Sequence, residues 1–322
     1  MLRLRLISAT VLIVVVASLC WADLRFGVDG AAGVWLLPLL MFFSLGTAWD
    51  FTRLLSGSNR LVSRRSTLIA TGVITLSAAV PMLWPIFGSD YPALCPVGRL
   101  GWLAMAVVGS VMGILIGEMV RYGRGPGGAV ERAAHGVFIA VYVGVPMALL
   151  VSLRSLGDWT GGTDGSRWGL MALVTMIAVT KSSDAGAYFT GKTIGRHKLI
   201  PRLSPGKTRE GSAGGIVAST VAAFLCLRYL MPEVGHPPGT ASIGFLAGES
   251  LRADLIASLI LGPLLAVSGM IGDLAESLVK RDCGAKDSGQ TLPGLGGVWD
   301  VTDSLIAAVM PAYLCFAAGV GW

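Results

Sequence analysis

Acidic and basic side chains gather in one polar stretch near the carboxyl end of the chain, between two apolar segments. Charge in such a place is costly unless it binds something. Carboxylate oxygens are ligands that Mg²⁺ prefers, and cationic side chains bind phosphate groups. The types and positions of these residues therefore predict metal and phosphate chemistry. The acids are Asp273, Asp287, Asp300 and Asp303, and the cations are Lys280, Arg281 and Lys286.

The first part of this stretch has helical spacing. Asp273, Ser277 and Lys280 are separated by four and three residues, and Arg281 follows at once. Side chains at such intervals share one face of a helix. Lys280 and Arg281 alone could be basic residues that extend from a helix end to the membrane surface. An acid within an apolar run usually faces a cavity and marks a site, so we assign Asp273 to a site.

A Gly-rich bend separates this helix from the next one. The sequence Pro-Gly-Leu-Gly-Gly at 293–297 disfavours regular helix and lets the backbone approach a ligand closely. Asp300 and Asp303 then fall on the first turn of the last helix, where capping explains one acid but not both. We predict that Asp273, Asp300 and Asp303 bind Mg²⁺, as one or two divalent ions or with a second ion of another kind.

A second group of polar residues precedes this stretch. Asp184 and Tyr188 are one helical turn apart, and a basic segment follows them. A Ser-Pro pair, a Lys-Thr pair and a glycine before a helix indicate an anion-binding helix start. Positive charge that only sets membrane orientation is an equally good interpretation. The candidate binding residues of this segment are Ser204, Lys207, Thr208 and Arg209.

One motif match is a coincidence on our interpretation. Residues 186–193 fit the phosphate-loop pattern G-x-x-x-x-G-K-[ST]. That pattern needs a buried strand before it and a helix after it, whereas these residues follow a membrane segment. We therefore do not assign nucleotide binding to them.

The elements that position these residues are predicted to be membrane helices. Apolar residues make up 53% of the chain and charged residues 14%, and the mean hydropathy is +0.70. A span needs about 20 apolar residues, and the backbone must satisfy its own hydrogen bonds in lipid. We therefore expect an all-α polytopic protein with about nine transmembrane helices. They lie near 6–22, 33–51, 66–88, 100–120, 136–156, 168–189, 211–231, 253–279 and 302–321.

The distribution of basic residues predicts the orientation. The N-terminus and the even-numbered loops hold 18 of the 25 Lys and Arg residues. Cytoplasmic loops carry this excess, so the N-terminus and the polar site are expected at the cytoplasmic face. We interpret 1–165 as a membrane helical scaffold and 166–322 as the catalytic half, with polar loops at 190–210 and 280–300.

Charge and small residues suggest the partners. The net charge is +6, but the basic residues lie beside membrane segments, which favours lipid head groups and nucleotide phosphates and excludes nucleic acid. Gly109, Gly113 and Gly117 form a stripe of small residues in the fourth segment. Such stripes permit close helix packing. We expect this one to pack within the chain rather than across a homodimer, which is the alternative.

Three motifs in order resemble those of the CDP-diacylglycerol synthases, also called phosphatidate cytidylyltransferases. Residues 277–303 read S-x-x-K-R-x4-K-D-x-G-x2-L-P-x2-G-G-x2-D-x2-D. Upstream, 184–195 read D-x-x-A-Y-x-x-G-x-x-x-G and 204–211 read S-P-x-K-T-x-E-G. The resemblance covers the C-terminal half, and the N-terminal half is similar only in being hydrophobic. In the family's pattern a histidine and an arginine stand where this chain has Leu295 and Val301.

The resemblance implies an enzyme of phospholipid biosynthesis that transfers a cytidylyl group from CTP to phosphatidate, giving CDP-diacylglycerol and pyrophosphate. It implies an integral protein of the cell (inner) membrane of a bacterium, surrounded by membrane lipids. The metal acids would serve catalysis with Lys280, Arg281, Lys286 and Asp287. Substrate binding would fall to Asp184, Tyr188, Ser204, Lys207, Thr208, Arg209, Ser277, Gly296 and Gly297.

Three alternatives stay open at this stage. The substrate could be another lipid phosphate. Because of Leu295 and Val301, the chain could be a non-catalytic relative that binds CTP without consuming it. A membrane transporter is the third alternative, with Asp184 and Lys181 lining a path through the membrane.

Overall fold

The computed structural model describes residues 2–92, 94–123, 127–158, 163–232 and 251–320. Within these ranges the regular secondary structure is helical apart from one two-stranded hairpin, which confirms the all-α prediction. The chain divides into two compact units, Met1–Ser152 with Val279–Thr302 and Leu153–Leu278 with Asp303–Trp322. Helices α9 and α10 contribute residues to both units. The predicted roles of a scaffold half and a catalytic half stay a prediction.

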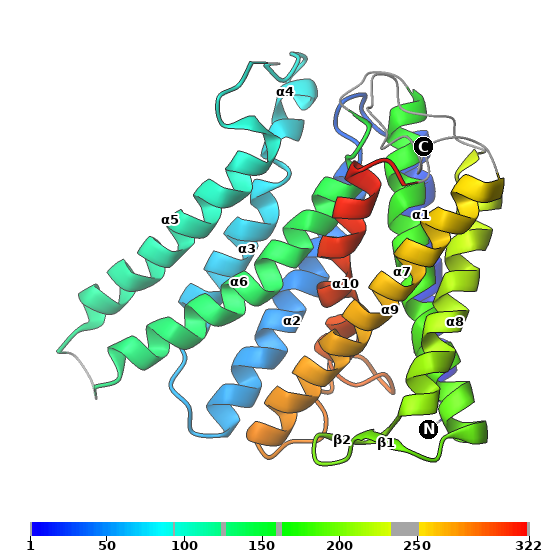
Figure 1. Cartoon of the computed structure of the whole chain (residues 1–322). Helices are drawn as coiled ribbons and strands as arrows, with labels where there is room; N and C mark the ends of the chain where they lie inside the picture. Colours follow the sequence, from blue (N-terminus) through cyan, green and yellow to red (C-terminus); the bar gives the residue numbers. More distant parts are fainter. Residues whose placement is uncertain (1, 93, 124–126, 159–162, 233–250, 321–322) are drawn as a thin grey trace. The chain divides into compact units, whose positions relative to one another are not determined.

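The first unit contains most of the N-terminal helices, which Figure 1 colours from blue to green. Helices α2, α3, α5 and α6 run side by side in it. Two 3-10 turns, η1 and η2, and a short helix, α4, connect these elements. The bounds are α1 Leu2–Arg25, η1 Val34–Leu36, α2 Leu37–Gly57, α3 Arg64–Ser77, η2 Val80–Met82, α4 Leu83–Ile86, α5 Gly98–Arg121 and α6 Ala129–Arg154.

The second unit contains the remaining elements. Helices α7 and α8 pack along each other, and the hairpin of β1 and β2 connects them (Figure 1). A π-helical turn, η4, continues α8. The bounds are α7 Thr163–Ile194, β1 Lys198–Ile200, β2 Ser204–Thr208, α8 Arg209–Leu225, η4 Cys226–Leu230, α9 Leu251–Asp282 and α10 Trp299–Ala317.

Every predicted membrane segment coincides with a helical segment, although residue 321 of the last one lies outside the described residues. Seven helices in the described ranges are long and apolar enough to cross a membrane. The number is eight if α3 is counted with the helical segment Val80–Ile86, which continues it after a bend of 52°. The 32-residue helix α7 is not among them. We attribute this to Lys181 and Asp184, which lower the hydropathy of its second half.

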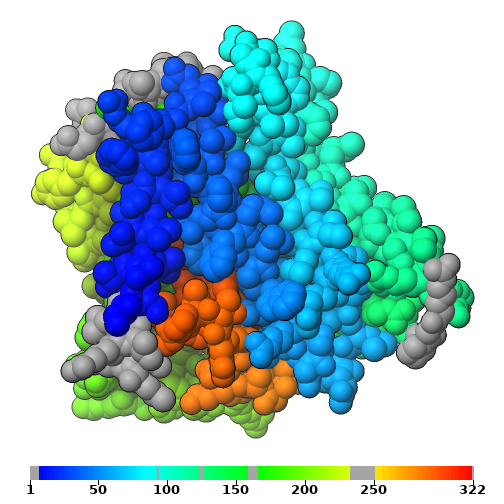
Figure 2. Space-filling view, turned by 180° about the vertical axis from the view of Figure 1, so that it is seen from behind, coloured from blue at the N-terminus to red at the C-terminus, as the bar shows by residue number. Residues whose placement is uncertain are grey.

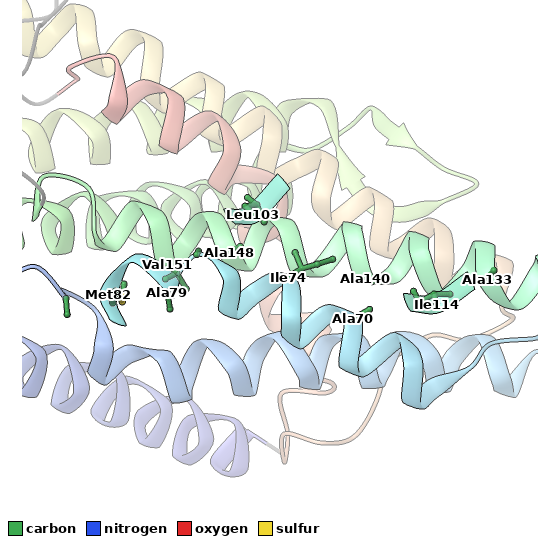
Figure 3. Packing of buried hydrophobic residues seen from close by; sticks show 12 residues of the cluster. Ala70, Ile74, Ala79, Met82, Leu103, Ile114, Ala133, Ala140, Ala148 and Val151 are labelled. Carbon is green, nitrogen blue, oxygen red and sulfur yellow. The ribbon is translucent and has the colours of Figure 1, made fainter. Parts of the chain in front are cut away.

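Small side chains fill the core of the first unit. Figure 3 shows alanines of α3 and α6 around Ile74, which is fully buried. At Gly144 an added Cβ would lie 3.0 Å from the Cβ of Ile74, so α6 approaches α3 closely there. Close approach through small residues is the usual way in which membrane helices pack.

The glycine stripe of α5 departs from the prediction. An added Cβ at Gly109, Gly113 or Gly117 would meet no atom within 4 Å. The stripe is therefore open along the described part of the chain, and the expectation that it packs within the chain was wrong. The face that it leaves open is available to lipid or to another molecule.

The helix pair of the second unit is held together by glycines. An added Cβ at Gly186 would lie 2.4 Å from that of Ala218, and one at Gly214 would lie 2.4 Å from that of Thr190. Residues 186–193 are helical throughout, which confirms that their match to the phosphate-loop pattern is a coincidence.

The segment predicted as a polar loop between α7 and α8 forms the hairpin. Lys198 pairs with Thr208 and Ile200 with Ser204. The hydroxyl of Thr208 then accepts the N–H of Gly211 at 3.1 Å and caps α8. This cap satisfies one of the free amide groups of the helix start.

Candidate functional site

A cavity of about 400 Å³ opens in the second unit between α7, the hairpin, α8 and α9. Helix α7 supplies an acid and an aromatic ring, β2 supplies a lysine and two hydroxyls, and α9 supplies a second acid. The cavity therefore brings together residues that the sequence analysis had placed in two separate motifs. The predicted site residues that line it are Asp184, Tyr188, Ser204, Lys207, Thr208 and Asp273.

Lys207 and Asp273 form an ion pair across this cavity. The Nζ of Lys207 lies 3.2 Å from an oxygen of Asp273 and 3.5 Å from the carbonyl of Met270. Each of the two charged side chains is about a quarter exposed, so solvent or a ligand can reach both. A phosphate group could replace the carboxylate as the partner of this ammonium group.

A second ion pair lies on α7 beside the cavity. The Nζ of Lys181 donates to Asp184 at 3.1 Å and to the hydroxyl of Ser304 at 2.8 Å. That hydroxyl in turn donates to Asp184 at 3.2 Å. Three side chains from two helices thus form a closed triangle. Asp184 and Lys181, which the transporter alternative placed along a path through the membrane, are therefore paired with each other.

Three acids of the second unit lie near one another. An added Cβ at Gly272 would lie 2.3 Å from the carbonyl oxygen of Asp303, so α10 packs directly on α9 beside Asp273. Asp303 interacts electrostatically with Asp273 and with Glu276. Asp303 and Glu276 are less than 10% exposed. Carboxylates gathered in this way repel one another when ionised, so either a shared proton or a bound cation would offset the repulsion.

The donor chemistry of these acids fits Mg²⁺, although geometry alone does not define a site. Among the residues that the structure describes, no group of three or more His, Cys, Asp and Glu side chains is arranged to enclose an ion. Mg²⁺ is commonly held by one or two carboxylates with water and substrate phosphates. Asp273 and Asp303 could supply such a pair. The joint site with Asp300 stays a prediction, since that residue belongs to the first unit.

In the first unit, Asp300 closes the Gly-rich loop that follows α9. One of its oxygens accepts the N–H of Gly297 at 2.7 Å and the hydroxyl and N–H of Ser288 at 2.7 and 3.3 Å. The other oxygen accepts from the Nζ of Lys280 at 2.9 Å. At Gly296 an added Cβ would lie 2.6 Å from Asp300, and the φ angle is +100°. A side chain at Gly296 would therefore collide with Asp300 and would also be strained by the backbone angle.

The opposite side of the loop rests on α2. Figure 2 shows the orange loop against the blue of α1 and α2. The hydroxyl of Ser8 donates to the carbonyl of Pro293 at 2.6 Å, and Thr291 and Val298 donate to the buried carboxyl of Asp50. The sequence analysis had assigned α1 and α2 to the membrane scaffold and had predicted no contact between them and this loop.

Other predicted residues neither line the cavity nor take part in the hydrogen bonds of Asp50 and Asp300 described above. Lys286 and Asp287 are exposed in the turn after α9, and Arg281 donates to the carbonyl of Ala285 at 3.3 Å. Arg209 is exposed on the first turn of α8, and Ser277 is half-buried on α9. Their roles stay predictions.

Sequence reasoning missed several residues of these two regions. Glu276, Ser304 and Ser288 have side chains that many sequences place in structural roles, so their types alone gave no signal. Asp50 did give one, because an acid near the end of an apolar segment is unusual. Lys181 was considered only for a transport path.

Ammonium groups paired with carboxylates beside a cavity, in a polytopic helical protein, are suited to binding phosphate groups at a membrane. The comparisons with known proteins give the family. The sequence profile of the cytidylyltransferase family matches residues 3–318. The chain belongs to the cytidylyltransferase family and is a membrane nucleotidyltransferase.

Relatives with known names agree with this assignment. A phosphatidate cytidylyltransferase of Brucella suis is 31% identical over 316 residues, which cover 97% of this chain and 92% of the relative. One of Bacillus subtilis is 36% identical over 172 residues, 53% of each chain. One of Haemophilus influenzae is 38% identical over 141 residues, 44% of each chain. The resemblance that the three motifs indicated is confirmed.

Proposed function

We propose that this enzyme transfers the cytidylyl group of CTP to phosphatidate and thereby forms CDP-diacylglycerol. The names of the full-length relatives support the two substrates. We place the enzyme in the inner membrane of a bacterium, with its polar loops at the cytoplasmic face, where CTP is available. This location is supported by the excess of basic residues in the loops that flank the site.

The reaction that we propose balances without an added base. A phosphate oxygen of phosphatidate attacks the α-phosphorus of CTP, a new P–O bond forms, and the bond to the β-phosphate breaks as pyrophosphate leaves. The attacking phosphate is already an anion at neutral pH. Positioning of the two substrates and neutralisation of charge therefore account for most of the catalysis.

The observation that carries this proposal is the cavity with the Lys207–Asp273 pair. Lys207 would exchange its carboxylate partner for a substrate phosphate, and Lys192 at the rim would add a second positive charge. Asp184, held by Lys181, would fix the polar end of a substrate. In the first unit, Lys280 would offset negative charge beside the loop that Asp300 closes.

We propose Asp273 and Asp303 as residues that hold Mg²⁺, with Asp300 as a further candidate. When bound, the ion would neutralise phosphate oxygens and so favour displacement of pyrophosphate. Lys207 would then be released from Asp273 and free to contact phosphate. Removal of the ion by a chelator should therefore abolish turnover and leave the fold intact.

The test is conversion of CTP and phosphatidate by purified protein in detergent with Mg²⁺, beside the Asp300→Asn and Asp273→Asn variants. Formation of CDP-diacylglycerol and pyrophosphate in equal amounts, lost in both variants, would establish the reaction. Product from another lipid phosphate but none from phosphatidate would mean that the enzyme acts on that other lipid phosphate. CTP binding without turnover in folded protein would overturn the proposal and favour a non-catalytic relative.

A further inference from the structure

We infer that Asp50, a buried acid of the N-terminal helix α2, is a positioning residue for the Gly-rich loop between α9 and α10. The side chain of Asp50 is 0% exposed. One oxygen accepts the N–H of Val298 at 2.6 Å and the N–H of Trp299 at 3.3 Å, and the other accepts the hydroxyl of Thr291 at 3.2 Å. A single carboxyl group thus binds both ends of the segment from Thr291 to Trp299.

Two backbone N–H groups at the end of the loop use this carboxyl as their acceptor. The N–H groups of Val298 and Trp299 belong to the start of α10, where a helix offers them no internal acceptor. Within the loop, Leu292 and Gly296 form one isolated bridge, and Gly294 has a φ angle of +78°. Such a segment has little regular structure of its own. The acid on α2 supplies the acceptor for Val298 and Trp299, as Asp300 does for Ser288 and Gly297.

Two glycines allow the carboxyl to come so close. An added Cβ at Gly289 would lie 2.5 Å from one oxygen of Asp50, and one at Gly297 would lie 2.5 Å from the other. Real Cβ atoms do not approach an oxygen so closely. A side chain at Gly297 would therefore collide with Asp50 and with the hydroxyl of Ser288, and one at Gly296 would collide with Asp300.

Neighbours of Asp50 on the same face of α2 bind the same segment. The ring of Phe51 stacks on that of Trp299 with centroids 4.1 Å apart. The hydroxyl of Thr47 lies 2.8 Å from that of Thr302. At Gly46 an added Cβ would lie 2.8 Å from a methyl group of Val298. Residues at such intervals share one helix face, so α2 presents a complete docking face to this segment.

The contacts continue from Asp50 to charged residues of the loop. Gly297 lies between Asp50 and Asp300, since its Cβ position approaches the first and its N–H donates to the second. Asp300 then binds Lys280. Asp50 would act on Lys280 and on a substrate only through the loop. The inference about turnover rests on the proposed function, while the inference about the loop stands on the contacts alone.

The experiment compares Asp50→Ala, Asp50→Asn and Thr291→Val with Asp23→Asn as a matched control. Asp23 is also a buried acid near a helix end of the first unit, and it also accepts two backbone N–H groups, those of Gly33 and Trp35 at 3.0 and 3.3 Å. Its contacts are to a different loop. Substitution of Asp23 or of Asp50 thus removes a buried carboxyl that accepts two backbone N–H groups. The two substitutions differ in which loop loses its acceptor.

Two readouts are measured on each variant. Hydrogen exchange of peptides that cover 288–299 reports the loop directly, and steady-state kinetics with CTP and phosphatidate report turnover. We expect exchange of this segment to rise on the order of ten-fold in Asp50→Ala. The rise should be smaller in Asp50→Asn and Thr291→Val, which keep part of the network, and absent in Asp23→Asn. We expect kcat to fall most in Asp50→Ala, less in Asp50→Asn and Thr291→Val, and not at all in Asp23→Asn, while KM changes little.

Unchanged loop exchange in Asp50→Ala would overturn the inference, whatever the activity. Faster exchange with undiminished kcat would overturn the positioning role. Wild-type protein without cytidylyl transfer would count against the proposed function alone, because the loop readout needs no substrate. If Asp50→Ala does not fold, Asp50→Asn and Thr291→Val decide the matter by the same two readouts.

Discussion

The acids of the two units are held in different ways. In the first unit, Asp50 on α2 and Asp300 each accept two backbone N–H groups of the loop. In the cavity of the second unit, Asp184 and Asp273 accept from the ammonium groups of Lys181 and Lys207. Backbone amides cannot leave an acid unless the loop changes shape, whereas a lysine side chain can rotate to a new partner.

This difference separates acids that shape the chain from acids that are free to exchange partners. Asp50 is fully buried, whereas both partners of the Lys207–Asp273 pair are partly exposed. A ligand can therefore enter the cavity by replacing one partner of an ion pair, at low structural cost. We expect substitutions in the cavity to affect ligands first, and substitutions in the loop to affect local structure first.

The largest effect is expected for Asp273→Asn. The amide keeps the size of the side chain and removes the charge that would hold Mg²⁺ and Lys207. We expect turnover to fall on the order of 10²-fold or more, as for loss of one electrostatic group at a reacting centre, with an unchanged unfolding temperature. The measurement is kcat with purified protein at saturating substrates.

Asp254→Asn is the matched control on the same helix. Asp254 pairs with Arg228 at 3.4 Å near the other end of α9, away from the cavity lining. Its variant should keep its turnover. Equal losses in both variants would show that any charge removed from α9 disturbs the enzyme, and would break the distinction between cavity and loop.

The next effect is expected for Lys207→Met. The variant removes the ammonium group that we assign to a substrate phosphate, and hydrogen bonds to charged groups contribute enough for a rise in KM of about 10–100-fold. Lys207→Arg should recover part of the affinity. Lys198→Met on the neighbouring strand, with an exposed side chain, is the control. A fall in kcat at unchanged KM would instead place Lys207 at the reacting atoms.

Lys181→Met should have a smaller effect, because Lys181 acts through Asp184. Loss of the ammonium group leaves Asp184 with the hydroxyl of Ser304 among its remaining partners, so we expect kcat to fall by about ten-fold. Lys181→Arg should recover part of it. Ser304→Ala combined with Lys181→Met should cost less than the sum of the single variants, since contacting residues are not additive. Additive losses would show that the triangle does not act as a unit.

The sequence predicted the helices and the cavity residues because both depend on local signals. Apolar runs of membrane length located the helical segments. Two motifs marked Asp184 and Lys207, and its place in an apolar run marked Asp273, and all three line the cavity. The hairpin of β1 and β2 was missed, since strands of three and five residues carry little periodic signal.

The support of the loop could not be predicted from local patterns. Asp50 and Val298 are 248 residues apart, and no spacing rule connects them. Gly297 was interpreted as an opening toward a ligand, whereas the carboxyl of Asp50 occupies that approach. The glycine stripe of α5 shows the same limit, because its sequence is equally suited to a packed face and to an open one.

The smallest effect is expected for Arg60→Ala. Arg60 forms an ion pair with Asp282, where α9 ends and the loop begins, and both side chains are well exposed, at 38% and 56%. Exposed pairs of this kind contribute about 0–1 kcal/mol to the free energy of unfolding, because water competes for both charges. We therefore expect a small change in the unfolding temperature, no change in kcat, and no change in hydrogen exchange of 288–299. High salt should remove even the change in unfolding temperature. If hydrogen exchange of 288–299 rose as much as in Asp50→Ala, the loop would be held from its exposed end. The buried carboxyl on α2 would then not be what fixes the shape of the loop.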